Sequence, residues 1–298
     1  MRKILPVLGI SLIYALCYTA IKLGLKYSPP LIFGGLRALI GGLALLGILL
    51  TLRQPILLDR RDLGIVFLIG LISTTINFGA MFLSPGFTNA GIASVLGNLQ
   101  PLAALLLAAI FLGERLIISK IAALLFGTAG VILIAFPAFS GRSVYGINGS
   151  LLALSASISS AIGSILVKKY ILKTNLLRFA AWQLIFGSMP LLAVSVIFEP
   201  VRIIEWTPVF LGLLLFLAIV GTTVVTAVWY WLLRKQEVGY LTQFLFLTPL
   251  FGLGIAALVF NERLSLLAST GVIFILVGIT IVARNPKKHS QADQMKHF

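Results

Sequence analysis

The chain has 298 residues, of which 59% are hydrophobic and only 10% are charged, and its mean hydropathy is +1.09. Soluble domains carry about 25% charged residues, so this composition excludes a soluble enzyme, a nucleic-acid-binding domain and a disordered chain. A membrane-spanning helix needs about 20 mostly apolar residues, so the length suffices for about ten spans. The net charge of +15 therefore matters through its distribution across the membrane.

Ten apolar runs follow one another along the chain and predict an all-α polytopic membrane protein. The first run begins after Arg2 and Lys3, as in a secretory signal, but no convincing cleavage site follows, so we interpret it as a retained helix. The expected spans are 4–21, 31–52, 63–83, 92–112, 121–136, 150–171, 177–198, 209–233, 241–260 and 266–282.

The basic residues predict the orientation of these spans. With both termini in the cytoplasm, 17 of the 23 lysines and arginines lie in inner segments, 5 lie in outer segments, and Arg37 falls within the second span. Inner loops of membrane proteins carry such an excess of positive charge. We therefore expect cytoplasmic termini in the inner membrane of a prokaryote.

The two halves of the chain resemble each other. An offset of 148 residues aligns Leu99-Gln100-Pro101-Leu102 with Leu247-Thr248-Pro249-Leu250, and Glu114-Arg115-Leu116 with Glu262-Arg263-Leu264. Five is an odd number of spans, so the second half enters the membrane inverted, as in many secondary transporters. The expected units are a first five-helix repeat at 1–141, a second, inverted one at 142–284, and a polar cytoplasmic tail at 285–298.

Pro101 and Pro249 lie at equivalent places in the fourth and ninth spans, near the membrane midplane. A proline removes a backbone donor and frees the carbonyl four residues earlier, here at Gly97 and Leu245. Two interpretations of these prolines remain open: they form helix kinks that shape a cavity, or they form ordinary kinks that pack against neighbouring helices. Asn98, Gln100 and Thr248 add polar side chains at the same level, as candidates for the cavity wall.

The first span carries Tyr14, Tyr18 and Lys22 at a spacing of four, which places them on one helical face. Lys22 either extends to the outer membrane interface or attracts a substrate carboxylate at the outer mouth. Arg37 lies about 9 Å below the outer surface at 1.5 Å per residue. We expect a structural role for Arg37, with helix-end carbonyls as acceptors.

Further polar and small residues mark the third, sixth and eighth spans. Asn77 and Phe78 are candidates for the cavity wall, and so are Ser159 and Thr222, while Gly221 favours close helix packing or gating. The sequence Trp229-Tyr230-Trp231 is interpreted as an aromatic belt at the cytoplasmic interface.

The acidic residues lie in loops, at helix ends or in the tail. Glu114 and Glu262 occupy equivalent positions, each beside an arginine, and are interpreted as structural anchors of turns. Proton relays usually need Asp, Glu or His within the membrane, so carboxylate-based proton coupling is not expected. An enzyme is not expected either, because intramembrane hydrolysis needs an activated nucleophile or a metal. We expect no metal and no cofactor, since Cys17 is the single cysteine.

These residues together resemble the EamA-type family of the drug/metabolite transporter superfamily over about residues 1–284. The resemblance rests on matching pieces spread over the chain: Lys22, Arg37, Thr88 to Leu96, Leu99-Gln100-Pro101, Gly113-Glu114-Arg115-Leu116, Gly221-Thr222, Leu247-Thr248-Pro249 and Glu262-Arg263-Leu264. The Trp-Gly pair near the start of that family's first helix is replaced here by Tyr14-Ala15. The resemblance implies two five-helix halves around a cavity lined by the first, third, fourth, sixth, eighth and ninth helices. It also implies transport of amino acids and related metabolites.

The expected function is therefore a secondary transporter for small neutral or zwitterionic solutes that works by alternating access. The alternative is a carrier or exchanger for anionic or nucleotide-like metabolites, with Lys22 and Arg37 as anion partners. The expected partners are the small-molecule substrate and the lipid bilayer, with no nucleic acid. A monomer is expected, because one chain already holds both repeats.

Overall fold

The computed structural model describes residues 5–84, 87, 96–139, 147–170, 175–199, 204–260 and 266–284. Every regular element in these ranges is a helix. Their bounds follow the expected spans, in chain order: α1 (Leu5–Gly24), α2 (Pro30–Thr51), α3 (Leu63–Gly70) with η1 (Leu71–Ile76) and α4 (Asn77–Leu83), α6 (Gln100–Leu112), α7 (Ile118–Phe139), α8 (Ile147–Tyr170), α9 (Leu176–Phe198), α10 (Pro208–Leu215) with η5 (Phe216–Val224) and α11 (Val225–Lys235), α12 (Val238–Leu241) with η6 (Thr242–Phe246) and α13 (Leu247–Phe260), and α14 (Leu266–Ala283).

Within the described ranges, nine helical segments are long and apolar enough to cross a bilayer, and the shorter apolar helix α6 is the tenth. Large apolar side chains cover the outer surface, as Ile110 and Ile197 illustrate, each 73% exposed. Such exposure would be unfavourable in water but suits contact with lipid chains. The prediction of a polytopic membrane protein with about ten helices is confirmed.

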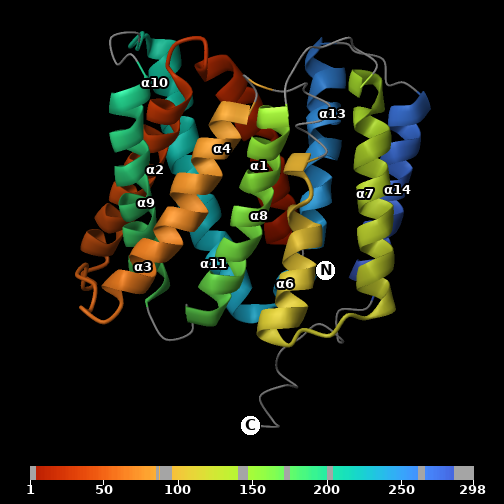
Figure 1. Cartoon of the computed structure of the whole chain (residues 1–298), viewed down its shortest axis with the longest axis horizontal. Coiled ribbons are helices and arrows are strands. Elements are labelled where there is room, and N and C mark those ends of the chain that lie inside the picture. Colours follow the sequence, from red (N-terminus) through yellow and green to blue (C-terminus); the bar gives the residue numbers. More distant parts are fainter. Residues whose placement is uncertain are drawn as a thin grey trace.

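Helix pairs close the two ends of the molecule (Figure 1). At one end α7 packs along α14, and at the other α2 packs along α9, while α1, α4, α6, α8 and α13 lie between them. In the first pair a Cβ atom added to Gly130 or Gly271 would lie 2.6 Å from the carbonyl oxygen of the other glycine. Small residues permit this close backbone approach, which stabilises helix pairs in membranes.

Two spans contain wide π-helical turns where the expected helices are otherwise continuous. η1 lies between α3 and α4, and η5 lies between α10 and α11. The two segments overlap at the offset of 148 residues that aligns the repeats. π-turns are rare and often lie at functional sites, and both of these border the centre of the molecule.

Candidate functional site

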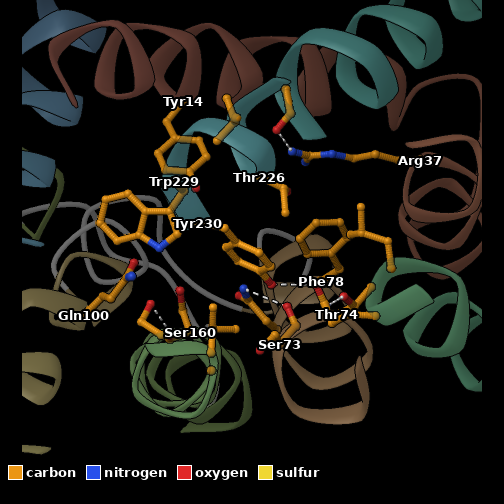
Figure 2. A pocket seen from close by; sticks show the side chains of 18 residues that line it. Tyr14, Arg37, Ser73, Thr74, Phe78, Gln100, Ser160, Thr226, Trp229 and Tyr230 are labelled. Atoms are coloured by element: carbon orange, nitrogen blue, oxygen red, sulfur yellow. Dashed lines mark hydrogen bonds between the residues drawn. The ribbon is translucent and has the colours of Figure 1, made fainter. Parts of the chain in front are cut away.

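A cavity of about 90 Å³ lies at the centre of the bundle, and both halves of the chain form its wall (Figure 2). The first half contributes Tyr14, Arg37, Ser73, Thr74, Asn77, Phe78 and Gln100. The second half contributes Ser160, Gly163, Ser164, Val167, Gln183, Leu184, Gly221, Val225, Thr226, Trp229 and Tyr230. The lining combines hydroxyls, amides and aromatic rings with a single positive charge.

Arg37 carries that charge. Its side chain is only 3% exposed, its Nε donates to Thr222 Oγ1 at 2.7 Å, and one terminal nitrogen donates to the carbonyl of Gly221 at 3.0 Å. The guanidinium carbon lies 4.8 Å from the ring centroid of Phe78, which adds a cation–π contact. Figure 2 shows the guanidinium reaching from α2 toward the space beside Tyr14 and Thr226.

Gln183 on α9 makes the corresponding contact on the other side of the cavity. Its Nε2 donates to Thr74 Oγ1 at 2.5 Å, and its Oε1 accepts a hydrogen bond from the hydroxyl of Tyr230 at 2.7 Å. Gln183 lies 146 residues after Arg37, and Thr222 lies 148 residues after Thr74. The two hydrogen bonds therefore join equivalent positions of the two halves.

The neighbouring threonines repeat this relationship. Thr75 Oγ1 donates to the carbonyl of Gly187 at 2.6 Å, and Thr223 Oγ1 donates to the carbonyl of Gly41 at 3.0 Å. Each π-helical segment is thus hydrogen-bonded to a helix of the other half through two consecutive threonines of its own. These bonds fix the positions of Ser73 and Gly221, which line the cavity beside them.

The two prolines lie in the first turns of their helices, after a local break in the chain. Before Pro101 the helical residues Leu96 and Gly97 are followed by a turn, and their carbonyls accept hydrogen bonds from Ser157 Oγ at 2.6 and 2.8 Å. Before Pro249 the 3₁₀ segment η6 includes Phe244, whose carbonyl accepts from Ser11 Oγ at 3.1 Å. A serine from the other half thus donates to backbone carbonyls at each of these breaks.

The structure brings together only part of the expected site. Several expected residues line the cavity: Tyr14, Arg37, Asn77, Phe78, Gln100 and Gly221. The other described candidates lie outside its wall: Tyr18, Lys22, Gly97, Asn98, Pro101, Ser159, Thr222, Thr248 and Pro249. Glu262 and the tail at 285–298 lie outside the described residues.

The reasons for these differences are local. Tyr18 is 51% exposed and Lys22 is exposed, one and two turns beyond Tyr14 along α1, so the stripe leaves the cavity level. Ser159 is buried and donates to the carbonyl of Ala156 at 3.1 Å within its own helix. Thr222 lies behind the wall, where it accepts the hydrogen bond from Arg37.

Two further expectations require correction. Trp229 and Tyr230 are 7% and 6% exposed and line the cavity, so they do not form an interfacial belt, whereas Trp231 is 42% exposed. The second and seventh helices contribute Arg37 and Gln183 to the wall, although the resemblance implied a peripheral second helix. The ninth helix, α12 to α13, contributes no residue to the cavity wall within the described ranges.

A second polar cluster lies at the ends of α6, α8 and α11. Glu114 accepts hydrogen bonds from the backbone N–H groups of Val238, at 2.6 Å, and Gly239, at 3.0 Å, at the start of α12. Lys120 Nζ lies 2.8 Å from a carboxylate oxygen of Glu237 and 3.6 Å from Glu114. Glu114 thus ties the end of the fourth helix of the first half to the start of the fourth helix of the second half.

The electrostatics of this cluster are set by burial. Glu114 is only 3% exposed, and desolvation raises the pKa of its carboxyl group, against the opposing effects of Lys120 and of the two backbone N–H donors. Lys168 Nζ donates to the carbonyls of Leu233 and Gln236, the latter at 2.8 Å. Several charges of the expected inner loops are therefore buried in helix-end contacts.

In the described part of the chain, no cluster of three or more His, Cys, Asp or Glu side chains could hold a metal ion. No carboxylate lines the cavity within the same ranges. The cavity residues can therefore bind by hydrogen bonding, by aromatic contact and through one guanidinium.

The sequence profile of the EamA-like transporter family matches residues 1–136 and 147–284, nearly the whole chain in two consecutive pieces. The chain belongs to this family. It is 30% identical to the uncharacterized transporter YvbV of Bacillus subtilis (strain 168), over 91% of this chain and 88% of that protein. It is 27% identical to a protein of Escherichia coli (strain K12) named a probable amino-acid metabolite efflux pump, over 91% of each.

The fold of this EamA-like transporter is also that of a protein of known crystal structure. The two structures superpose with a TM-score of 0.83 at 16% sequence identity, over 96% of this chain and 98% of the other. The family and the named relatives support a multi-pass membrane transporter.

Proposed function

We propose that this protein is a secondary transporter for small neutral or zwitterionic organic solutes, most simply amino acids or related metabolites, and that it works by alternating access. The central cavity carries the proposal, because residues from both halves of the chain form its wall. In transporters built from inverted repeats, the substrate lies between the repeats and is exposed to each side in turn. The relative named as an amino-acid metabolite efflux pump supports the same substrate class.

The composition of the wall favours a small solute that is neutral overall. A volume of about 90 Å³ is well below the roughly 300–1,000 Å³ of pockets for drug-sized ligands. Hydroxyl and amide groups offer hydrogen bonds, while Tyr14 and Trp229 offer aromatic surface. Nucleotide-like substrates fit less well, because the cavity is small and Lys22, their second expected anion partner, is exposed and not part of the wall.

The proposal includes the orientation and the energetics. The two repeats, at 1–141 and 142–284, would exchange access as a monomer in the cytoplasmic membrane, with both termini in the cytoplasm. Transport would run down the gradient of the substrate, because no acid lines the cavity in the described ranges to carry a coupled proton.

The test is counterflow in proteoliposomes that contain the purified full-length protein. Vesicles loaded with an unlabelled neutral amino acid are diluted into the labelled one, with and without a pH gradient, and protein-free vesicles are the control. We expect transient accumulation of label that is the same with and without the gradient. Accumulation that requires the pH gradient would contradict uncoupled transport, and no accumulation with any neutral amino acid would contradict the substrate class.

A further inference from the structure

We propose that Arg37 is the binding site for a carboxylate group of the transported solute. This inference rests on the proposed transport function and names the chemical group by which the cavity recognises its substrate. It starts from one atom: the second terminal nitrogen of Arg37 is buried and has no hydrogen-bond partner in the structure.

The other two nitrogens of the guanidinium each already donate one hydrogen bond. Nε and one terminal nitrogen are held by Thr222 and by the carbonyl of Gly221, which fixes the plane of the group. Arginine stays protonated in proteins, and its free terminal nitrogen still carries two N–H donors. The guanidinium is thus pre-oriented, with unused donors at the cavity wall.

The positive charge of Arg37 is balanced only by aromatic rings and by uncharged acceptors in the described ranges. Among the ion pairs found in the described ranges, none involves Arg37, and no carboxylate lines the cavity around it. A buried charge without an ionic partner is costly, and within membranes such residues usually mark a substrate or ion pathway. Arginine matches the planar geometry of a carboxylate, which would supply both the missing charge and the missing acceptor.

The equivalent position in the other half makes its threonine contact without a charge. Gln183 holds Thr74 with a neutral amide, just as Arg37 holds Thr222 with a guanidinium. The two positions therefore make the same helix-to-helix hydrogen bond, but only one of them places a cation at the wall. This asymmetry gives the cavity one positive side, and Trp229 and Gln100 lie on the opposite side of the view in Figure 2.

The proposal is tested with the purified full-length protein and pairs of probes that differ in the carboxylate. Acetate, 4-methylpentanoate, alanine and leucine are each compared with the corresponding amide, and binding is measured as an increase in the unfolding temperature. We expect the wild-type protein to be stabilised by members of the carboxylate series but not by their amides.

The key variant is Arg37→Gln, because Gln183 makes the threonine contact with a glutamine at the equivalent position of the other half. We expect Arg37→Gln to fold and to lose roughly ten- to hundredfold in carboxylate affinity, the usual contribution of a hydrogen bond to a charged group. Arg37→Lys should retain part of the affinity, since an ammonium keeps the charge but not the fork geometry. Lys26→Gln, which removes an exposed charge between α1 and α2, is the matched control and should bind as the wild type does.

The outcomes separate this inference from the proposed function. Equal carboxylate binding by the wild type and Arg37→Gln, or no carboxylate-dependent shift in the wild type, would overturn the inference. Neutral amino acids transported equally by both proteins would leave the transport function standing and overturn the carboxylate site. Arg37-dependent binding of simple carboxylates without amino-acid transport would support the site and contradict the zwitterionic substrate.

Discussion

Arg37 and Gln183 make the same hydrogen bond at equivalent places of the two halves, each to a threonine in a π-helical turn of the opposite half. The adjacent threonines, Thr75 and Thr223, repeat the relationship with backbone carbonyls. The centre of the protein is therefore built twice from the same contacts, and the two copies differ in charge. In the proposed alternating-access mechanism, the equivalent contacts would serve the two sides in turn, and the proposed carboxylate site uses the difference in charge.

The charge difference predicts unequal effects of two matched substitutions. Thr222→Val removes the acceptor of a charged donor, whereas Thr74→Val removes the acceptor of a neutral amide. Hydrogen bonds to charged groups contribute more to stability than neutral ones. We expect Thr222→Val to lower the free energy of unfolding by about 1 kcal/mol more than Thr74→Val does. The comparison is made by unfolding both variants in detergent, and equal losses would mean that the charge adds nothing to this contact.

The close pairing of α7 and α14 predicts a steric effect. Gly130→Ala places a methyl group against the backbone of Gly271, and overpacking of this kind costs roughly 1–3 kcal/mol. Gly47→Ala is the control, because nothing lies within 4 Å of its added Cβ. The control should be neutral or slightly stabilising, since alanine favours a helix over glycine. Similar unfolding temperatures for both variants would refute close packing at Gly130.

The buried cluster around Glu114 predicts a large loss of stability. Glu114→Ala leaves two N–H groups of α12 without their acceptor and removes a neighbouring negative charge from Lys120. Removal of one partner of a buried charged cluster costs about 3–5 kcal/mol. Glu205→Ala, at an exposed carboxylate, is the control and should change little. A loss no larger than that of the control would show that this contact does not join the two halves.

The raised pKa of Glu114 determines how the stability lost in Glu114→Ala should depend on pH. The folded protein holds the proton of this carboxyl at a higher pH than the unfolded chain does, so the contribution of Glu114 is largest below the ordinary carboxyl pKa. The contribution falls as pH rises through the raised pKa of the folded state. We therefore expect Glu114→Ala to destabilise more at about pH 5 than at about pH 8. Unfolding of both proteins at the two pH values checks the sign, which would be reversed if ion pairing outweighed desolvation.

The sequence predicted the helices well because membrane spans depend on long apolar runs. The expected third span, 63–83, matches α3 to α4 at both ends, although a π-helical turn interrupts it. The faces of the helices were harder to predict, because apolar residues surround every span and do not mark the side that meets the cavity. A π-turn adds a residue to one turn and rotates all that follows, so the position of Trp229 after η5 could not be read from regular helical spacing.

On the unbroken helix α1, two of the three candidates lie outside the cavity wall for a different reason. Tyr14, Tyr18 and Lys22 do share a face, but Lys22 lies about 12 Å along the axis from Tyr14, beyond the small cavity. The role of Gln183 was missed although its alignment with Arg37 was visible in the repeat. The offset of 146 residues pairs Gln183 with Arg37, and both residues line the cavity, so this alignment marks Gln183 as a candidate.

The most direct test of a substrate path through the cavity is to fill the cavity and measure transport. Ser160→Trp places an indole in the wall of the cavity, and Ile158→Trp places one on the same helix at a side chain that is 40% exposed. Both variants are reconstituted at equal protein content and assayed by counterflow of a labelled neutral amino acid. We expect Ser160→Trp to abolish counterflow and Ile158→Trp to retain it. Undiminished counterflow by a folded Ser160→Trp protein would contradict a substrate path through this cavity.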